Sequence, residues 1–321
     1  MRVIHVAAGI LTDAQCRVLL MQRLPGTHLA GLWEFPGGKL EANESNEQAL
    51  ARELREELGL EAHAFAPLIS LPWTYPEKTI RLHALRVTGW RGEPQAREGH
   101  PLRWSALDDI DADAMPPADR PILAALRLPP CYAITLPKWG QVHFSGQLRE
   151  ALMNISNNEP YPIPDVLLQL RFPGSDRDDV RRIARDLLSI YPALQQRLLI
   201  NGDIELARGL GVGVHLHAAQ LFERQERPLP RDVWIGASCH DAGELGRAAG
   251  IGADFATLSP VCATVSHPRT HPMGWERFAQ LVADARLPVY ALGGVGPDDL
   301  DRARAAGAQG VAGINGFFPA S

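Results

Sequence analysis

Three glutamates, Glu53, Glu56 and Glu57, lie three and four residues apart in a segment with helical periodicity. This spacing places their carboxylates on one face of a helix, where like charges repel by roughly a few tenths of a kcal/mol per pair. A hard divalent cation with oxygen ligands would remove that repulsion, and Mg²⁺ suits a phosphate substrate. The cluster therefore predicts a metal site for phosphate chemistry.

Helix signals surround the glutamates. Ser45 and Gln48 have the spacing of a capping box, in which two side chains satisfy free backbone amides at a helix start. Gly59 is suited to the left-handed residue that ends a helix. A buried stripe is expected at leucines four residues apart, namely Leu50, Leu54 and Leu58. The sequence therefore predicts one helix, with the glutamate cluster on a face that points away from the buried leucines.

The longer segment 38–60 fits the pattern G-x5-E-x7-R-E-U-x-E-E-x-G-U at every specified position, U being aliphatic. A lone glutamate cluster is most often a solvated helix face. Here a glycine loop, Glu44 and Arg52 also stand at their pattern positions, so that alternative is disfavoured. The segment resembles the Nudix box, and the chain up to about residue 128 resembles the MutT branch, the 8-oxo-dGTP diphosphatases.

This resemblance implies roles for individual residues. The metal ligands would be the Gly37 carbonyl and four glutamates, Glu53, Glu56, Glu57 and Glu98. Catalytic roles would fall to Glu53, Glu44 and Glu98. The substrate would be bound by Arg23, His28, Glu34, Phe35, Pro36 and Asp119. Taken alone, His28 or Arg23 would be an ordinary surface residue.

The resemblance also implies a reaction. Mg²⁺, which Mn²⁺ can replace, would support hydrolysis of 8-oxo-dGTP to nucleoside monophosphate and pyrophosphate, which sanitises the nucleotide pool and prevents mutation. At Asp119 the MutT branch usually has asparagine. A buried aspartate has a raised pKa and could stay protonated, whereas an aspartate at a helix start could instead be a solvated cap. Two alternatives remain, namely hydrolysis of thiamine-related diphosphates and a barrel that senses ligands or acts as a scaffold.

The sequence changes character near residue 129, where the segment 126–130 indicates a linker. Eight short apolar strands then alternate with helical patterns or loops, which predicts a (β/α)8 barrel. The strands are expected at Tyr132–Thr135, Val166–Arg171, Leu198–Asn201, Gly213–His217, Trp234–Cys239, Phe255–Pro260, Val289–Gly293 and Gly310–Ile314. We expect an α/β protein with a Nudix α/β/α sandwich containing a mixed sheet at 1–129 and a compact TIM-type barrel at 130–321.

The second part resembles thiamine-phosphate synthase and its relative TenI. The resemblance rests on Tyr-Ala-Ile-Thr at 132, Gln-Leu-Arg at 169, Leu-Ile-Asn at 199, Gly-Val-His-Leu at 213, Gly-Ala-Ser-Cys-His at 236 and Gly-Gly-Val at 293. The family's acids and lysines are replaced by Gly202, Gln220, Pro173 and His267, while Thr264 and Ser266 keep hydroxyl groups. The TenI histidine is replaced by Ser259-Pro260. Neither synthase nor tautomerase activity is expected.

Anion binding could survive in the barrel. Gly293 and Gly294 allow close backbone approach, and barrels often hold phosphate in their last loops. A phosphorylated ligand and a purely structural barrel remain equal alternatives.

Composition limits the remaining functions. The 321 residues carry a net charge of −5, which argues against a nucleic-acid polymer as partner. The sequence has neither a signal-peptide core nor an apolar run of membrane-spanning length. The four cysteines lie far apart and are expected to be buried, reduced thiols. These features favour a cytoplasmic protein without a membrane partner.

Overall fold

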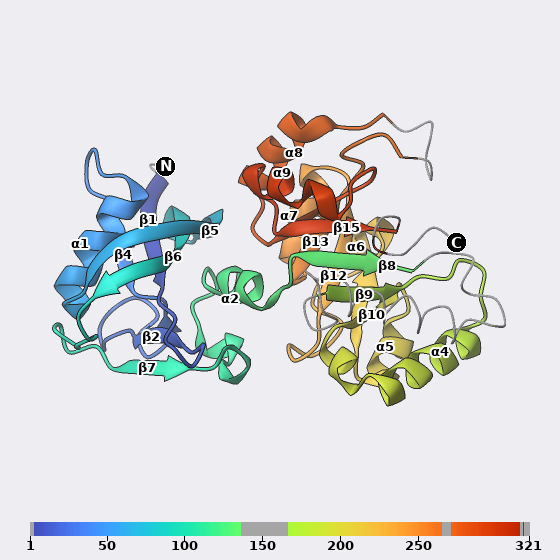
Figure 1. The fold of residues 1–321 in the computed structure, drawn as a ribbon, viewed down its shortest axis with the longest axis horizontal. Helices are drawn as coiled ribbons and strands as arrows, with labels where there is room; N and C mark the ends of the chain where they lie inside the picture. Colours follow the sequence, from blue (N-terminus) through green and yellow to red (C-terminus); the bar gives the residue numbers. More distant parts are fainter. Residues whose placement is uncertain (1–2, 136–165, 265–270, 315–316, 318–321) are drawn as a thin grey trace. The chain divides into compact units, whose positions relative to one another are not determined.

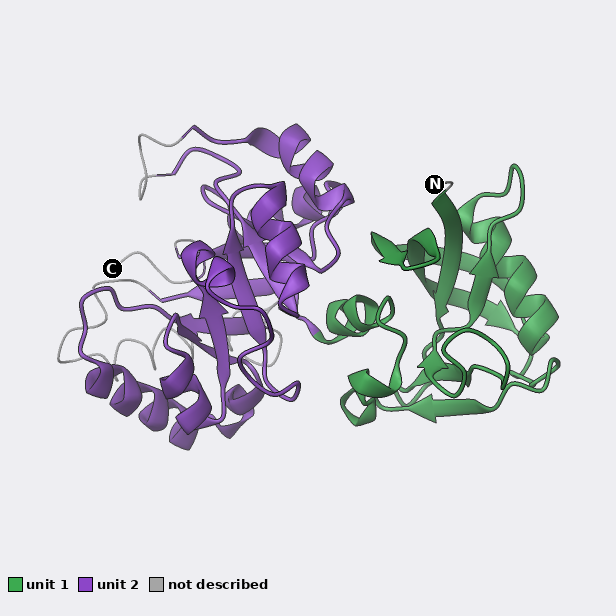
Figure 2. Cartoon of the chain, turned by 180° about the vertical axis from the view of Figure 1, so that it is seen from behind, with its two compact units in different colours: residues 1–127 green, residues 128–321 purple. Residues whose placement is uncertain are grey.

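The computed structural model describes residues 3–135, 166–264, 271–314 and 317. Contacts within the chain divide it into two compact units, Met1–Arg127 and Leu128–Ser321 (Figures 1 and 2). The predicted α/β class, a sandwich followed by a barrel, is confirmed.

The first unit contains a mixed sheet of strand order β4-β1-β6-β5 and an antiparallel sheet of order β3-β2-β7. Strand β1 pairs in parallel with β6 and antiparallel with β4, which makes the larger sheet mixed. The strands are β1 (Val3–Ile10), β2 (Val18–Gln22), β3 (Trp33–Glu34), β4 (Gly37–Lys39), β5 (Glu61–Tyr75), β6 (Lys78–Arg91) and β7 (Leu102–Ser105).

Helices cover both faces of the larger sheet. Helix α1 (Asn46–Leu58) packs on the side of Ala7, and helix α2 (Arg120–Arg127) packs on the side of Ala8. Consecutive residues of a strand point to opposite faces, so these two cores are separated by the sheet. Short 3₁₀ turns, η1 (Leu107–Asp109) and η2 (Ala112–Ala114), precede α2.

Helix α1 forms as the sequence predicts. The Ser45 hydroxyl accepts a 3.2 Å hydrogen bond from the Gln48 amide, and the Gln48 side chain accepts a 2.8 Å bond from the Ser45 amide. Gly59 ends the helix with a φ of 72°. The three leucines of the predicted stripe are fully buried, and each such burial stabilises the fold by roughly 1.5–3 kcal/mol.

The second unit is a closed barrel of parallel strands in the order β10-β11-β12-β13-β14-β15-β8-β9. The eight predicted strands are all present and begin or end within one or two residues of the expected positions. They are β8 (Cys131–Ile134), β9 (Val166–Leu170), β10 (Leu198–Asn201), β11 (Gly213–Leu216), β12 (Ile235–Cys239), β13 (Phe255–Leu258), β14 (Val289–Leu292) and β15 (Gly310–Gly313). Parallel neighbours require crossover connections.

Those connections contain helices wherever the structure describes them. They are α4 (Arg177–Ile190), η5 (Pro192–Gln196), α5 (Ile204–Leu210), α6 (Ala218–Phe222), α7 (Ala242–Gly250), α8 (Gly274–Ala283), η6 (Pro297–Asp299) and α9 (Leu300–Ala305). Apolar residues of the helices and strands share one continuous core.

The cysteine prediction is wrong in part. None of the four cysteines, all of which the structure describes, forms a disulfide, but Cys16 is exposed and Cys262 is only half-buried, while Cys131 and Cys239 are buried as expected. Cys16 lies between β1 and β2 with a φ of 59°, in a turn that faces solvent. Among the described residues, no helix combines the length and the apolar character needed to cross a membrane.

Candidate active site

Two glycines let β4 approach both the sheet and helix α1. A Cβ atom at Gly37, where φ is 142°, would lie 2.2 Å from the carbonyl oxygen of Ala7. A Cβ atom at Gly38 would lie 2.2 Å from a carboxylate oxygen of Glu53. A side chain at Gly37 would collide with the backbone of β1, and one at Gly38 would displace the Glu53 carboxylate. The glycines thus bring the loop carbonyls beside the first of the clustered glutamates.

Arg52 holds the glutamates of the cluster in place. Its Nε and Nη2 atoms donate to the two carboxylate oxygens of Glu44 at 2.9 and 3.0 Å. Its Nη1 atom donates to Glu53 at 2.9 Å and to Glu56 at 3.3 Å, and Nη2 also reaches the Lys39 carbonyl at 2.9 Å. The Arg52 guanidinium lowers the pKa of Glu44 to about 2, which makes Glu44 a weak proton acceptor with both oxygens engaged.

Glu57 occupies the least favourable position in the cluster. Burial, together with the charges of Glu53, Glu98 and Glu34, raises its pKa to about 8. Its Oε2 atom is buried and has no hydrogen-bond partner among the described residues. A buried carboxylate oxygen without a donor, beside other carboxylates, fits a divalent cation, which would supply the missing positive charge.

The loop after β6 is anchored to the end of helix α1. The Gln95 amide donates to the Leu58 carbonyl and the Arg97 amide to the Glu57 carbonyl, each at 3.0 Å. The Arg97 guanidinium packs over Gly59, where a Cβ atom would lie 2.5 Å from its Nε. These contacts carry Glu98 from a distant part of the chain to the carboxylate of Glu57.

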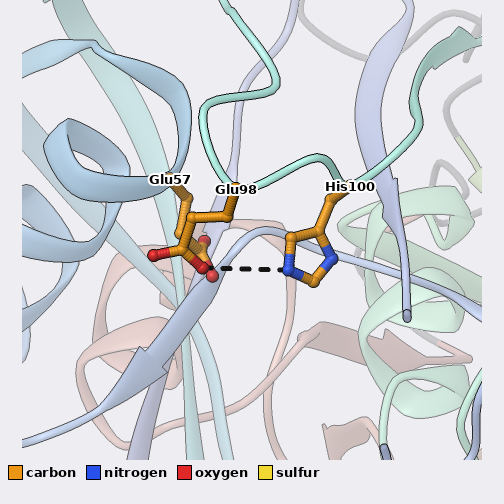
Figure 3. A group of neighbouring side chains, drawn as sticks. All are labelled: Glu57, Glu98 and His100. Atoms are coloured by element: carbon orange, nitrogen blue, oxygen red, sulfur yellow. Dashed lines mark ion pairs between the residues drawn. The ribbon is translucent and has the colours of Figure 1, made fainter. Parts of the chain in front are cut away.

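His100 joins the two glutamates, although the sequence reasoning missed it. Ligand atoms of Glu57, Glu98 and His100 all lie within 4.8 Å of one another (Figure 3). The His100 Nε2 atom is 3.9 Å from a Glu98 oxygen, and its Nδ1 atom is 3.0 Å from the carbonyl oxygen of Gln22. The sequence signal for His100 was its position two residues after Glu98, a predicted ligand.

A pocket of about 210 Å³ adjoins the glycine loop. Of the residues predicted to bind substrate, Pro36 does not line the pocket, and its carbonyl instead accepts a 2.8 Å hydrogen bond from the Gly9 amide. The predicted residues that line it are Arg23, His28, Glu34, Phe35 and Asp119, and Gly37 lines it as well. The pocket therefore extends from the loop of Gly37 and Gly38 to Asp119.

Asp119 lies at the closed end of this pocket rather than in solvent. It precedes α2 but is only 7% exposed. Burial raises the pKa of Asp119 well above its ordinary range, the charge of Glu34 adds to that effect, and Arg23 and the Phe35 backbone oppose it. This burial excludes the solvated helix cap, and it disfavours the ionised form of the carboxyl group.

Arg23 and Glu34 form an ion pair inside the pocket. The Arg23 Nε atom also donates to the His28 carbonyl at 2.6 Å, which fixes the guanidinium between two loops. Burial raises the pKa of Glu34, while Arg23 holds it down. The pair thus places one positive and one negative group beside Asp119.

Tyr75 is a further pocket residue that the sequence reasoning missed. Its ring meets the His28 ring edge-on, with the centroids 5.1 Å apart. Burial raises the pKa of Tyr75 to about 12, and the charge of Asp119 acts in the same direction. Tyr75 stands at the end of β5, and nothing in the strand pattern distinguishes it from other strand residues.

The barrel interior contains a buried chain of polar side chains. Gln169 donates to Asn201 at 2.8 Å, so its carbonyl oxygen is free to accept the Tyr132 hydroxyl proton at 3.2 Å. Because the Tyr132 hydroxyl donates to Gln169, its oxygen must accept a hydrogen bond from the His215 Nδ1–H group, 2.9 Å away. The His215 Nε2 atom accepts from Ser238 at 2.9 Å. This pattern leaves His215 neutral, and burial lowers its pKa to about 3.

At the carboxyl end of the barrel strands, His217 lies where a side chain at residue 202 would point. Gly202 has a φ of 70°, and a Cβ atom there would lie 2.6 Å from the His217 ring. The Gln220 side chain donates to the Gly202 carbonyl at 2.8 Å and accepts from the His217 amide at 3.0 Å. These groups bind one another and offer no carboxylate to a cation.

Comparison with known proteins agrees with this division. Residues 7–125 match the family described as NUDIX domain, and residues 132–317 match the family described as thiamine monophosphate synthase. The 8-oxo-dGTP diphosphatase of Escherichia coli K12 is 37% identical over 127 residues, which cover 40% of this chain and 98% of the relative.

A putative thiamine-phosphate synthase of Geobacter sulfurreducens is 34% identical over 154 residues, 47% of this chain and 72% of that protein. The chain belongs to both families. Its Nudix domain is also 42% identical to the CTP pyrophosphohydrolase of Escherichia coli K12. That match extends over 125 residues, 39% of this chain and 92% of the relative. The homology supports hydrolase activity for the Nudix domain.

In the Nudix domain Arg52 joins Glu44, Glu53 and Glu56, while Glu57 and Glu98 converge beside His100. Nudix hydrolases of the MutT type generally depend on a divalent metal. The thiamine monophosphate synthase domain departs from its family at Gly202 and Gln220, as described above. Pro173 follows β9 and has no ammonium group to offer. Ser266 and His267 lie outside the described residues. Gly293 and Gly294 approach protein backbone, since a Cβ atom at Gly294 would lie 2.3 Å from the Ala263 carbonyl oxygen.

Proposed function

We propose that the Nudix domain hydrolyses 8-oxo-dGTP to nucleoside monophosphate and pyrophosphate with Mg²⁺, which Mn²⁺ can replace. The observation that carries this proposal is the buried Asp119 in a pocket that opens beside the glycine loop. The relative named 8-oxo-dGTP diphosphatase supports the choice of substrate. Hydrolysis of this nucleotide would sanitise the nucleotide pool and prevent mutation.

A protonated Asp119 matches the edge of the oxidised base. Its hydroxyl can donate to O6, and its carbonyl oxygen can accept from the N7–H group that 8-oxoguanine has and guanine lacks. Phe35 offers an apolar surface in the same pocket. A site built to pair with N7–H rejects a base without it, because the carboxyl group would then stay unpaired.

On the phosphate side, Glu53, Glu56, Glu57, Glu98 and the Gly37 carbonyl would hold the cation. When bound, it supplies charge neutralisation at the phosphates and lowers the pKa of water. Arg52 fixes Glu53 and is itself held by Glu44, which we place as a positioning residue. The Glu98 side chain is 56% exposed, and the His100 Nε2 atom, 3.9 Å from it, is too far away for a hydrogen bond. Glu98 is suited to accept the proton of the attacking water.

The bond changes follow from attack at the β phosphorus. The water oxygen bonds to that phosphorus and its proton passes to Glu98. The bond that breaks joins the β phosphorus to the oxygen that bridges it to the α phosphorus. The bridging oxygen leaves with the nucleoside monophosphate, and the water oxygen leaves in pyrophosphate.

The barrel domain is proposed to lack thiamine-phosphate synthase activity. A magnesium–diphosphate substrate needs carboxylates, and Gly202 and Gln220 supply none. Retained phosphate binding is a second candidate, supported by the family resemblance. Its test is a thermal shift of the full chain with inorganic phosphate or thiamine phosphate.

The test of the hydrolase is a screen of the full chain with Mg²⁺ against 8-oxo-dGTP, dGTP, CTP and thiamine diphosphate, with products separated by chromatography. The expected result is the highest kcat/KM for 8-oxo-dGTP, with release of pyrophosphate. A higher kcat/KM for CTP would assign the chain to the activity of its other relative. A higher value for thiamine diphosphate would support a joint role of the two domains in thiamine chemistry.

A further inference from the structure

His100 presents one ring nitrogen to the protein backbone and the other to the carboxylates. Its side chain is 15% exposed. The Nδ1 atom lies 3.0 Å from the Gln22 carbonyl oxygen, and a carbonyl can only accept a hydrogen bond. Nδ1 therefore carries a proton, and in the neutral ring Nε2 has a free lone pair.

That lone pair faces acceptors. The His100 Nε2 atom is 3.9 Å from the nearer Glu98 oxygen, a separation too long for a hydrogen bond. A cation about 2.1 Å from each of the two atoms would fit this separation, because two such bonds placed end to end are longer than it. Glu57 contributes an oxygen to the same group, and its Oε2 atom is buried without a hydrogen-bond partner among the described residues. A divalent cation between these three electron-pair donors would be bound by all of them at once.

We infer that His100 is a nitrogen ligand to a divalent cation held by Glu57 and Glu98. This inference rests on the proposed metal-dependent hydrolysis and names a ligand that the resemblance to MutT did not supply. The Gln22 carbonyl orients the ring, as a backbone acceptor does for metal-binding histidines in general.

The nitrogen ligand has a consequence for the choice of metal. Imidazole suits transition metals, whereas Mg²⁺ takes oxygen ligands. The site therefore favours Mn²⁺ over Mg²⁺ more strongly than an all-oxygen site would.

Two variants separate ligation from orientation. His100→Asn keeps an amide donor near the Gln22 carbonyl but loses the second nitrogen. His100→Gln places an amide oxygen near the position of Nε2 and loses the bond to Gln22. The matched control is His63→Asn, since the His63 Nδ1 atom also lies close to a backbone carbonyl, that of Glu61 at 3.3 Å, on an exposed strand position.

The measurement is electron spin-echo envelope modulation of Mn²⁺ bound to the full-length protein without nucleotide, which detects directly bound imidazole nitrogen. The wild type and His63→Asn should show nitrogen modulation, and both His100 variants should lack it. The Mn²⁺ dissociation constant should rise roughly tenfold to a hundredfold in His100→Asn. The preference for Mn²⁺ over Mg²⁺ should fall in His100→Gln.

Wild-type protein that binds Mn²⁺ at the site without nitrogen modulation would overturn the assignment, whether or not the variants fold. Modulation that survives in His100→Asn would assign the nitrogen to another residue. Because no nucleotide is present, a protein that shows the modulation but fails to hydrolyse 8-oxo-dGTP would refute the proposed substrate and leave the ligand in place.

Discussion

The Arg97 amide donates a 3.0 Å hydrogen bond to the carbonyl oxygen of Glu57. This bond joins a loop to the last turn of helix α1, where the carbonyl groups lack partners within the helix. The next residue in the loop is Glu98, so the bond sets the distance between two carboxylates that are far apart in the sequence. The proposed metal site therefore depends on how a helix ends as well as on its glutamates.

Gly59→Ala should loosen the joint between this loop and the end of helix α1. Alanine at a φ of 72° costs roughly 1 kcal/mol, and its Cβ atom would lie 2.5 Å from the Arg97 Nε atom. We expect a lower Tm and a Mg²⁺ affinity reduced at least several-fold, measured by calorimetry. Gly26→Ala is the matched control, because φ is 84° there and nothing lies within 4 Å of the added atom. An equal loss of Mg²⁺ affinity in both variants would argue against the joint.

Glu57→Gln and Glu53→Gln should both lower kcat by orders of magnitude, because each removes a charge with little change in volume. They should differ in stability. The pKa of Glu57 in the folded protein is about 8, above its ordinary 4.5. In metal-free protein its ionisation therefore opposes folding as pH rises above 4.5, up to about 8.

Removing that charge in Glu57→Gln should raise the Tm in EDTA at pH 8. Glu53 accepts a 2.9 Å bond from Arg52, so Glu53→Gln should not raise the Tm. The measurement is thermal unfolding beside steady-state kinetics at saturating Mg²⁺. Near-full turnover in either variant would remove that glutamate from the metal site.

Asp119 should make the preference for 8-oxo-dGTP over dGTP depend on pH. Burial raises its pKa, so the carboxyl group stays protonated to a higher pH than an ordinary aspartate and ionises as pH rises further. The ratio of kcat/KM for the two nucleotides should therefore fall with increasing pH, since an ionised carboxylate cannot donate to O6. Asp119→Asn should keep the preference and flatten its pH profile. Identical profiles in the two proteins would exclude Asp119 from base recognition.

The fragment 1–129 should hydrolyse nucleotide alone, because every residue assigned to the reaction lies within it. A folded but inactive fragment would show that the barrel completes the site. The full chain should form no thiamine phosphate. Gly202→Asp should not restore the synthesis, because the His217 ring occupies the space beside residue 202. Synthesis by the wild type would overturn the proposed loss of this activity.

His215 should make the barrel sensitive to acid. Its pKa falls from an ordinary 6.5 to about 3 in the fold because the ring is buried, so the unfolded chain binds the proton more tightly. Stability contributed by the neutral ring is present above pH 6.5 and declines below it, by about 1.4 kcal/mol per pH unit, until about pH 3. His215→Gln should reduce this slope in the calorimetric transition of the barrel, with His240→Gln as an exposed control. Equal slopes in the wild type and His215→Gln would show that His215 does not cause the acid sensitivity of the barrel.

Local interactions explain what could be predicted from residue types and spacing. The capping box of Ser45 and Gln48, the leucine stripe and the Gly59 stop all act within a few residues, so α1 is visible in the sequence. The barrel strands are short apolar runs between breakers, and they too were found. The metal-site glutamates share one helix or come from the Nudix resemblance.

Contacts between distant segments decided the rest. Burial of Asp119 depends on a pocket walled by several strands and loops, and only that burial distinguishes the proposed base-pairing group from a solvated cap. His100 meets Glu57 because a loop is tied to the end of α1, and His217 occupies the space beside Gly202 because β10 and β11 are neighbours. Burial and charge depend on every neighbouring segment at once, so the same residue type has different chemistry at different positions of the fold.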